Sequence, residues 1–186
     1  MELLPAPRLA WANGWILLAV FYSVFGFLLW RFPRDVVRRL YDKSGWSREE
    51  HMLINAGKVF ALIAFGLVFL APLKFGEGVF ALGTALFALG LGGFVIALRD
   101  FARTPLDCPV TGGLYNVSRN PQVAALSVAG LGMCIAIGSW AAVVAWMLSH
   151  LSSPLRILAE EKSCLRQYGD AYRSYMRRVP RYFLFF

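Results

Sequence analysis

Charged residues are scarce in this sequence. Lysine, arginine, aspartate and glutamate make up 16% of its 186 residues, whereas about a quarter is usual for a soluble domain. Hydrophobic residues reach 58%, and the mean hydropathy is +0.56. This composition argues against a soluble domain and predicts an integral membrane protein of the all-α class.

Cysteine and histidine are also rare. The three cysteines lie far apart, and their odd number does not suggest a disulfide framework. Neither His51 nor His150 has a second ligand at metal spacing, so we expect no metal site. No short signal peptide precedes the first hydrophobic run, which is itself long enough to span a bilayer.

Long hydrophobic runs predict about five transmembrane helices in a single membrane domain. Three single spans are expected at residues 9–30, 53–73 and 79–98. The run over 123–155 is too long for one span and short for two, so the Gly-Ser-Trp sequence at 138–140 predicts a tight hairpin of spans four and five. After Pro154 the chain is polar, and we expect a cytoplasmic tail helix with Gly169 as its C-cap.

The basic residues follow the same five-span pattern. With five spans, the first loop (31–50), the third loop (99–121) and the tail (156–181) share one side of the bilayer, and they hold 16 of the 19 lysines and arginines. Cytoplasmic loops are enriched in these residues, so the C-terminus is expected in the cytoplasm and the N-terminus outside. Topology and attraction to anionic lipid explain the net charge of +8, and no nucleic-acid partner is needed.

Two glycine-containing segments stand out in the second half. Gly90 and Gly92 occur late in the third span, where glycine either lets another helix approach closely or lets a ligand lie against the backbone. The segment 112–115 ends in Tyr115 and predicts a turn.

The segment Arg119-Asn120-Pro121 follows that turn and predicts the start of the fourth span. Pro121 suits the first helical position and Asn120 the N-cap. Arg119 is either an interfacial anchor or an anion contact.

An acidic pair, Glu160-Glu161, follows the hairpin. Glu161 lies three residues after Leu158 and four before Leu165, so it sits on the apolar stripe of the tail helix and faces inward. A carboxylate placed there needs a cationic partner. Glu160 lies four residues after Arg156, which predicts a surface ion pair. The tyrosines and basic residues beyond 168 are either an interfacial anchor or a lid over a cavity.

These motifs, taken in order, resemble the integral membrane methyltransferases related to isoprenylcysteine carboxyl methyltransferase and phosphatidylethanolamine N-methyltransferase. The resemblance covers about residues 88–181. Its motifs are Gly90-Leu91-Gly92, Gly113-Leu114-Tyr115, Arg119-Asn120-Pro121, Glu160-Glu161 and Tyr168-Gly169-Asp170-Ala171-Tyr172-Arg173-Ser174-Tyr175.

The resemblance implies that S-adenosyl-L-methionine binds without a Rossmann domain, in the methyltransferase-like core at residues 76–186, while residues 1–75 form spans one and two. Gly90 and Gly92 would line the cofactor channel. Arg119 and Glu161 are the implied catalytic residues. Further cofactor contacts are implied for Tyr115, Asn120, Pro121, Glu160, Glu161 and Tyr172.

The implied substrate is a lipophilic or lipid acceptor, either an isoprenylcysteine-like carboxylate or a phospholipid amine. Asn120 replaces the histidine of the carboxyl methyltransferases, whereas the tail is more similar to that group. Two alternatives stay open. One is an NADPH-dependent reductase related to the sterol reductases, which are much longer. The other is a non-enzymatic membrane protein that binds anionic lipid.

Overall fold

The computed structural model describes residues 1–7, 11–42 and 46–182. Helices are its only regular elements over these ranges, and they confirm the predicted all-α class. Residues 9 and 10 of the first predicted span, and the basic residues Arg8 and Lys43, fall outside the described residues. The elements are α1 (Trp15–Arg31), α2 (Arg34–Tyr41), α3 (Arg48–Leu70), α4 (Gly78–Arg103), η1 (Gly113–Asn116), α5 (Pro121–Ala136), α6 (Trp140–Ser149), η2 (His150–Ser152) and α7 (Ser153–Arg178).

Two stretches of helix are long and apolar enough to cross a membrane by length and composition. They are α4 and the stretch of α6, η2 and α7, from Trp140 to Arg178, which is kinked at Gly169. The apolar helices Trp15–Arg31, Ile54–Leu70 and Pro121–Ala136 are shorter. The count of five spans therefore stays a prediction.

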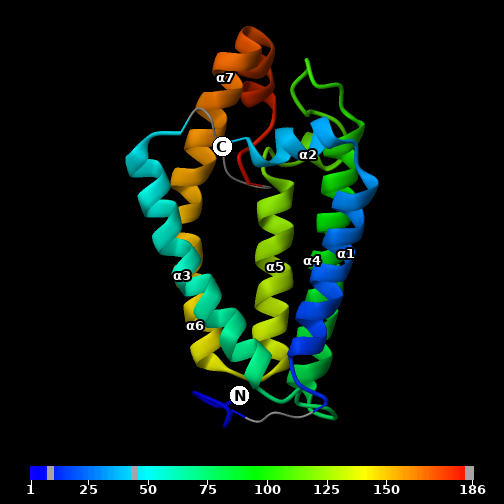
Figure 1. Ribbon diagram of the computed structural model, residues 1–186, viewed down its shortest axis with the longest axis vertical. Coiled ribbons are helices and arrows are strands. Elements are labelled where there is room, and N and C mark those ends of the chain that lie inside the picture. Colours follow the sequence, from blue (N-terminus) through cyan, green and yellow to red (C-terminus); the bar gives the residue numbers. More distant parts are fainter. Residues whose placement is uncertain (8–10, 43–45, 183–186) are drawn as a thin grey trace.

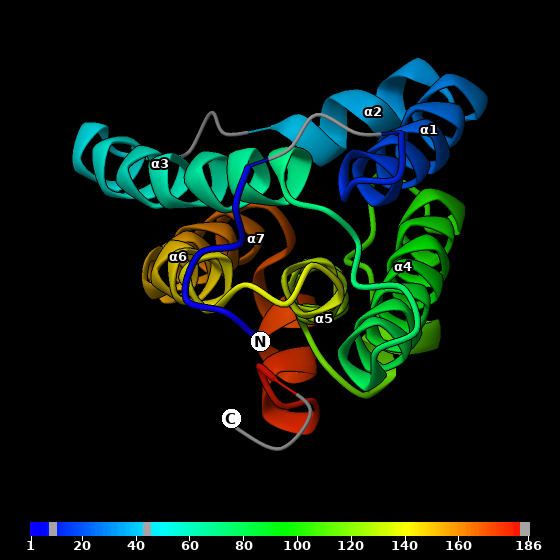
Figure 2. The same ribbon diagram turned by 90° about the horizontal axis from the view of Figure 1, so that it is seen from below.

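Helix α5 lies in the middle of the bundle, with α4 on one side and α6 and α7 on the other (Figure 2). Glycines let α4 and α5 approach closely. A Cβ atom built on Gly90 would lie 2.3 Å from the Ala129 backbone nitrogen, and one built on Gly132 would lie 2.4 Å from that of Phe87. No side chain fits at such distances, so small residues set the spacing of these helices.

The predicted hairpin is formed by α5 and α6. Gly138 turns the chain with a φ of 67°, and the Ser139 hydroxyl caps α6 by accepting a hydrogen bond from Ala142 N at 3.2 Å. Trp146 on α6 donates its indole N–H to the carbonyl of Ser127 on α5 at 3.0 Å. Its ring lies where Gly130 leaves room, which locks the two helices together.

The tail helix is divided at Gly169. This residue has a φ of 54° and a ψ of −126°, so the helix is interrupted there as expected. The first helical stretch therefore ends at this glycine, as predicted, and a second stretch follows it to Arg178. Tyr172 and Tyr175 lie on the second stretch, and both are buried.

The three basic segments gather at one end of the molecule. Helix α2, the connection between α4 and α5, and the second half of α7 lie together at the top of Figure 1. The N-terminal segment and the turns between α3 and α4 and between α5 and α6 lie at the opposite end. We call the first end the basic end, and it carries the site described next.

Candidate functional site

A cavity of about 360 Å³ opens at the basic end, where α2, η1, the start of α5 and α7 meet. Six of the nine implied catalytic and cofactor-binding residues line it, namely Tyr115, Arg119, Asn120, Glu160, Glu161 and Tyr172. Asp35 and Arg39 of α2 add to the wall. The cavity is thus built mainly from the second half of the chain but is completed by a helix from the first half.

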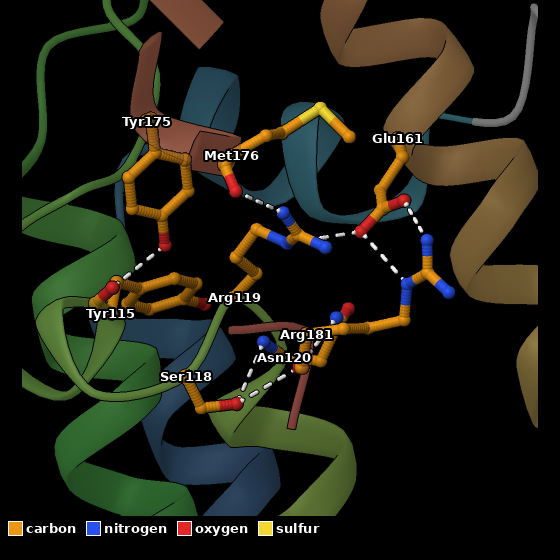
Figure 3. Close-up of polar contacts among 8 residues, drawn as sticks. All are labelled: Tyr115, Ser118, Arg119, Asn120, Glu161, Tyr175, Met176 and Arg181. Atoms are coloured by element: carbon orange, nitrogen blue, oxygen red, sulfur yellow. Dashed lines mark hydrogen bonds and ion pairs between the residues drawn. The ribbon is translucent and has the colours of Figure 1, made fainter. Parts of the chain in front are cut away.

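Glu161 is the most buried carboxylate of the site, with 4% of its surface exposed. Its predicted inward orientation and its need for a cationic partner are both confirmed. Arg119 Nε lies 3.1 Å from Glu161 Oε1, and Arg181 Nη2 donates to Oε2 at 2.8 Å (Figure 3). A single carboxylate therefore lies between two guanidinium groups.

Arg119 is held from several sides. Its Nη1 donates to the Met176 carbonyl at 2.8 Å, and its backbone N–H donates to the Pro180 carbonyl at 3.0 Å. The Nε atom is close to Glu161 but forms no aligned hydrogen bond, so this contact is an ion pair. Arg119 is buried, with 8% of its surface exposed, and its predicted contact with a ligand anion stays a prediction.

Asn120 stands at the predicted N-cap of α5 and Pro121 at the first helical turn, as expected. The side chain of Asn120 does not cap the helix, however. Its amide Nδ2 donates to the Arg181 carbonyl at 3.1 Å, which also accepts a hydrogen bond from the Ser118 hydroxyl at 3.1 Å. Asn120 therefore fastens the C-terminal segment across the start of α5. Pro121 is buried and is not part of the cavity wall, so its implied cofactor contact stays a prediction.

Tyrosines contribute to the wall of the cavity. The Tyr175 hydroxyl donates to the Tyr115 carbonyl at 2.7 Å, and Gln122 Nε2 donates to the Tyr115 hydroxyl at 2.8 Å. Burial raises the pKa of Tyr115 well above its usual range, so its phenol is neutral at physiological pH. The predicted tail tyrosine Tyr172 packs beside Tyr175, with ring centroids 5.6 Å apart.

Glu160 forms the predicted ion pair with Arg156, whose Nε lies 2.9 Å from its Oε1. Both side chains are about 40% exposed, yet both line the outer part of the cavity. This carboxylate is therefore more available to a ligand than that of Glu161.

Gly90 and Gly92 do not line this cavity. Gly90 is buried against α5, which is the helix-packing role, and Gly92 is exposed with open space around it. Their implied place in a cofactor channel stays a prediction that this geometry does not support.

Sequence reasoning missed Arg39, which joins three segments around the cavity. Its Nη1 donates to the Pro105 carbonyl at 3.1 Å, and its Nη2 donates to the Cys108 carbonyl at 2.6 Å and to the Tyr168 hydroxyl at 3.0 Å. Its guanidinium also lies 5.0 Å from the centroid of the Phe101 ring. No local pattern could have identified this residue, because its partners lie more than 60 positions away.

Comparison with known proteins adds one finding. A family model described as phospholipid methyltransferase matches residues 68–171, which is more than half of the chain. The match includes Tyr115, Arg119, Asn120 and Glu161, and it ends one residue before Tyr172 and ten before Arg181. No curated protein and no solved structure gave a match. Among the described residues, no group of three histidines, cysteines or carboxylates could hold a metal ion.

Proposed function

Because the chain belongs to the phospholipid methyltransferase family, we propose that it is a membrane enzyme that transfers a methyl group from S-adenosylmethionine to a lipophilic acceptor. The observation that carries this proposal is the buried Glu161 in the wall of the cavity. A buried carboxylate is costly unless it meets a cation. Arg119 and Arg181 supply that charge here, and an ammonium or sulfonium of the cofactor would take the place of Arg181.

The residues of the cavity fit such a cofactor. Its volume lies within the usual range of about 300–1,000 Å³ for small-molecule sites. Glu160 and Glu161 would hold the cationic groups and Arg119 the carboxylate, while the tyrosine rings offer flat apolar surfaces for the base. The bound cofactor supplies an electrophilic methyl group, and the protein positions the acceptor in line with it.

The contact between Arg181 and Glu161 bears on how a cation would enter. Arg181 supplies a guanidinium where a cationic ligand would pair with Glu161. The Arg181 side chain is 29% exposed, while its backbone carbonyl is held by Ser118 and Asn120. We expect the guanidinium to turn toward solvent and leave Glu161 to the ligand, with the backbone of the segment staying in place.

The acceptor class depends on whether a proton must be removed. A carboxylate is already nucleophilic, whereas an amine must first lose a proton to a base. The carboxylate of Asp35 lines the cavity and would serve as that base. A lipid phosphate or carboxylate would pair with a cavity arginine such as Arg156.

We further propose that the bundle crosses the membrane five times, with the basic end in the cytoplasm and the N-terminus outside. The basic end carries the site, so a water-soluble cofactor would enter there. The lipophilic acceptor would arrive from the bilayer.

Titration calorimetry of the full chain in detergent tests the cofactor. S-adenosylmethionine and its homocysteine product should bind at micromolar affinity or better, and Glu161→Gln should abolish binding. The exposed Glu49→Gln serves as a matched control and should bind like the wild type. Binding of NADPH in place of both ligands would favour a reductase, and binding of none of them would favour a non-enzymatic protein.

Labelled methyl transfer identifies the acceptor. The full chain is supplied with labelled cofactor and, separately, with phospholipid amines and with prenylcysteine. Label in the phospholipid would assign an amine acceptor, and label in prenylcysteine would assign a carboxylate. Cofactor binding without label in either pool would contradict both proposed acceptor classes.

A further inference from the structure

A second crevice lies between α1 and α4, and it shares no residue with the cavity of the candidate site. The two helices run side by side in the same direction toward the basic end (Figures 1 and 2). The crevice has a volume of about 580 Å³. Its apolar wall is formed by Val24, Phe27, Leu28, Phe32 and Val95.

Two arginines, Arg31 and Arg99, also line the crevice. Arg31 is the last residue of α1, and Arg99 lies one turn before the end of α4, so both lie near the basic end. Both are exposed. Within the part of the chain that the structure describes, neither has a carboxylate partner. By contrast, Arg38, Arg156 and Arg173 at the same end each pair with an acidic residue.

The crevice extends from the arginines toward the middle of the bundle. Ser23, at its other limit, lies eight residues before Arg31 on the same helix. At 1.5 Å per residue this corresponds to about 12 Å, which is long enough for much of a lipid acyl chain.

We propose that this crevice binds one anionic phospholipid, with an acyl chain between α1 and α4 and the phosphate on Arg31 and Arg99. Arginine pairs well with phosphate because its fork of donors matches the phosphate oxygens. Two cations without a carboxylate favour an anionic headgroup over a zwitterionic one, whose ammonium would meet no partner. The site is separate from methyl transfer and does not depend on it.

Native mass spectrometry of the full chain, released from detergent, tests the proposal. The chain is offered phosphatidylglycerol and phosphatidylcholine with identical acyl chains. Wild-type protein should retain one phosphatidylglycerol in preference to phosphatidylcholine. The double variant Arg31→Gln/Arg99→Gln should lose roughly 25-fold in that preference, since each arginine near an anionic surface contributes about a factor of five.

A control of equal charge separates this site from a general basic surface. Arg177→Gln/Arg178→Gln removes two exposed arginines from the tail and should retain the preference. Equal losses in both double variants would overturn the proposal, because the attraction would then belong to the whole basic end. An unchanged preference in Arg31→Gln/Arg99→Gln would overturn it as well.

A soluble headgroup distinguishes a lipid site from a phosphate site. Glycerol 3-phosphate carries the phosphate without acyl chains, and at equal concentration it should leave the bound phosphatidylglycerol in place. Displacement of the lipid by this compound would overturn the proposal, since the crevice would then contribute nothing to binding.

Discussion

Glu161 and Arg181, twenty residues apart in the chain, meet through a two-point contact. Arg181 Nη2 donates to Oε2 at 2.8 Å, and Arg181 Nε donates to Oε1 at 3.2 Å. This fork geometry is the strongest that arginine and a carboxylate form. The contact links the C-terminal segment to α7 at the wall of the cavity. Arg119 pairs with the same carboxylate from the other side.

Arg181→Gln should strengthen the binding of S-adenosylhomocysteine. The guanidinium competes for Glu161, and a partly exposed ion pair contributes up to about 1 kcal/mol, which corresponds to about fivefold in affinity. Calorimetry measures the change, with Arg178→Gln as the control. Weaker binding in Arg181→Gln would mean that this arginine holds the ligand instead of competing with it.

Glu161→Ala should destabilise the protein and not only impair binding. It leaves the Arg119 side chain, of which only 4% is exposed, without its carboxylate partner. Breaking a buried pair in this way costs about 3–5 kcal/mol. Thermal unfolding in detergent should show a clear fall in midpoint, and the double variant Glu161→Ala/Arg119→Met should recover part of it. Equal midpoints for wild type and Glu161→Ala would contradict a buried pair.

Features of this site that depend on neighbouring residues in the chain could be predicted from the sequence. The spacing of the apolar residues around Glu161 predicted that it faces inward from a helix. The preference of asparagine for the N-cap and of proline for the first helical turn predicted that Asn120 and Pro121 begin α5. Both predictions depend on neighbours within a few residues, which the sequence displays directly.

Contacts between distant segments could not be predicted. The side-chain amide of Asn120 donates to the carbonyl of Arg181, 61 residues later in the chain. This tertiary contact replaces the predicted hydrogen bond to the start of α5. Gly90 illustrates the same limit. Close helix packing and ligand contact both favour glycine, and only the position of Ala129 shows which one applies. Membrane crossings are a further limit, because helix lengths alone do not show where a bilayer lies.

Arg39→Ala should loosen the wall of the cavity. Arg39 bonds to the connection after α4 and to Tyr168 of α7, and lysine cannot make these contacts together. Hydrogen exchange over residues 104–112 should rise in Arg39→Ala and also in Arg39→Lys. Arg38→Ala is the matched control because its side chain is 81% exposed. Unchanged exchange in Arg39→Ala would show that other contacts hold the connection.

The two glycines of α4 offer a paired test of packing against cofactor binding. Gly90→Ala should destabilise the bundle, because its Cβ would lie 2.3 Å from the Ala129 backbone and force α4 and α5 apart. Gly92→Ala meets nothing within 4 Å and should raise stability slightly, since alanine favours a helix over glycine by about 1 kcal/mol. Thermal unfolding measures both changes. Calorimetry with S-adenosylhomocysteine should show unchanged binding in Gly92→Ala. A stable Gly92→Ala protein that no longer binds the ligand would instead place this glycine at the cofactor, as the resemblance implies, and would require a channel that the cavity described above does not include.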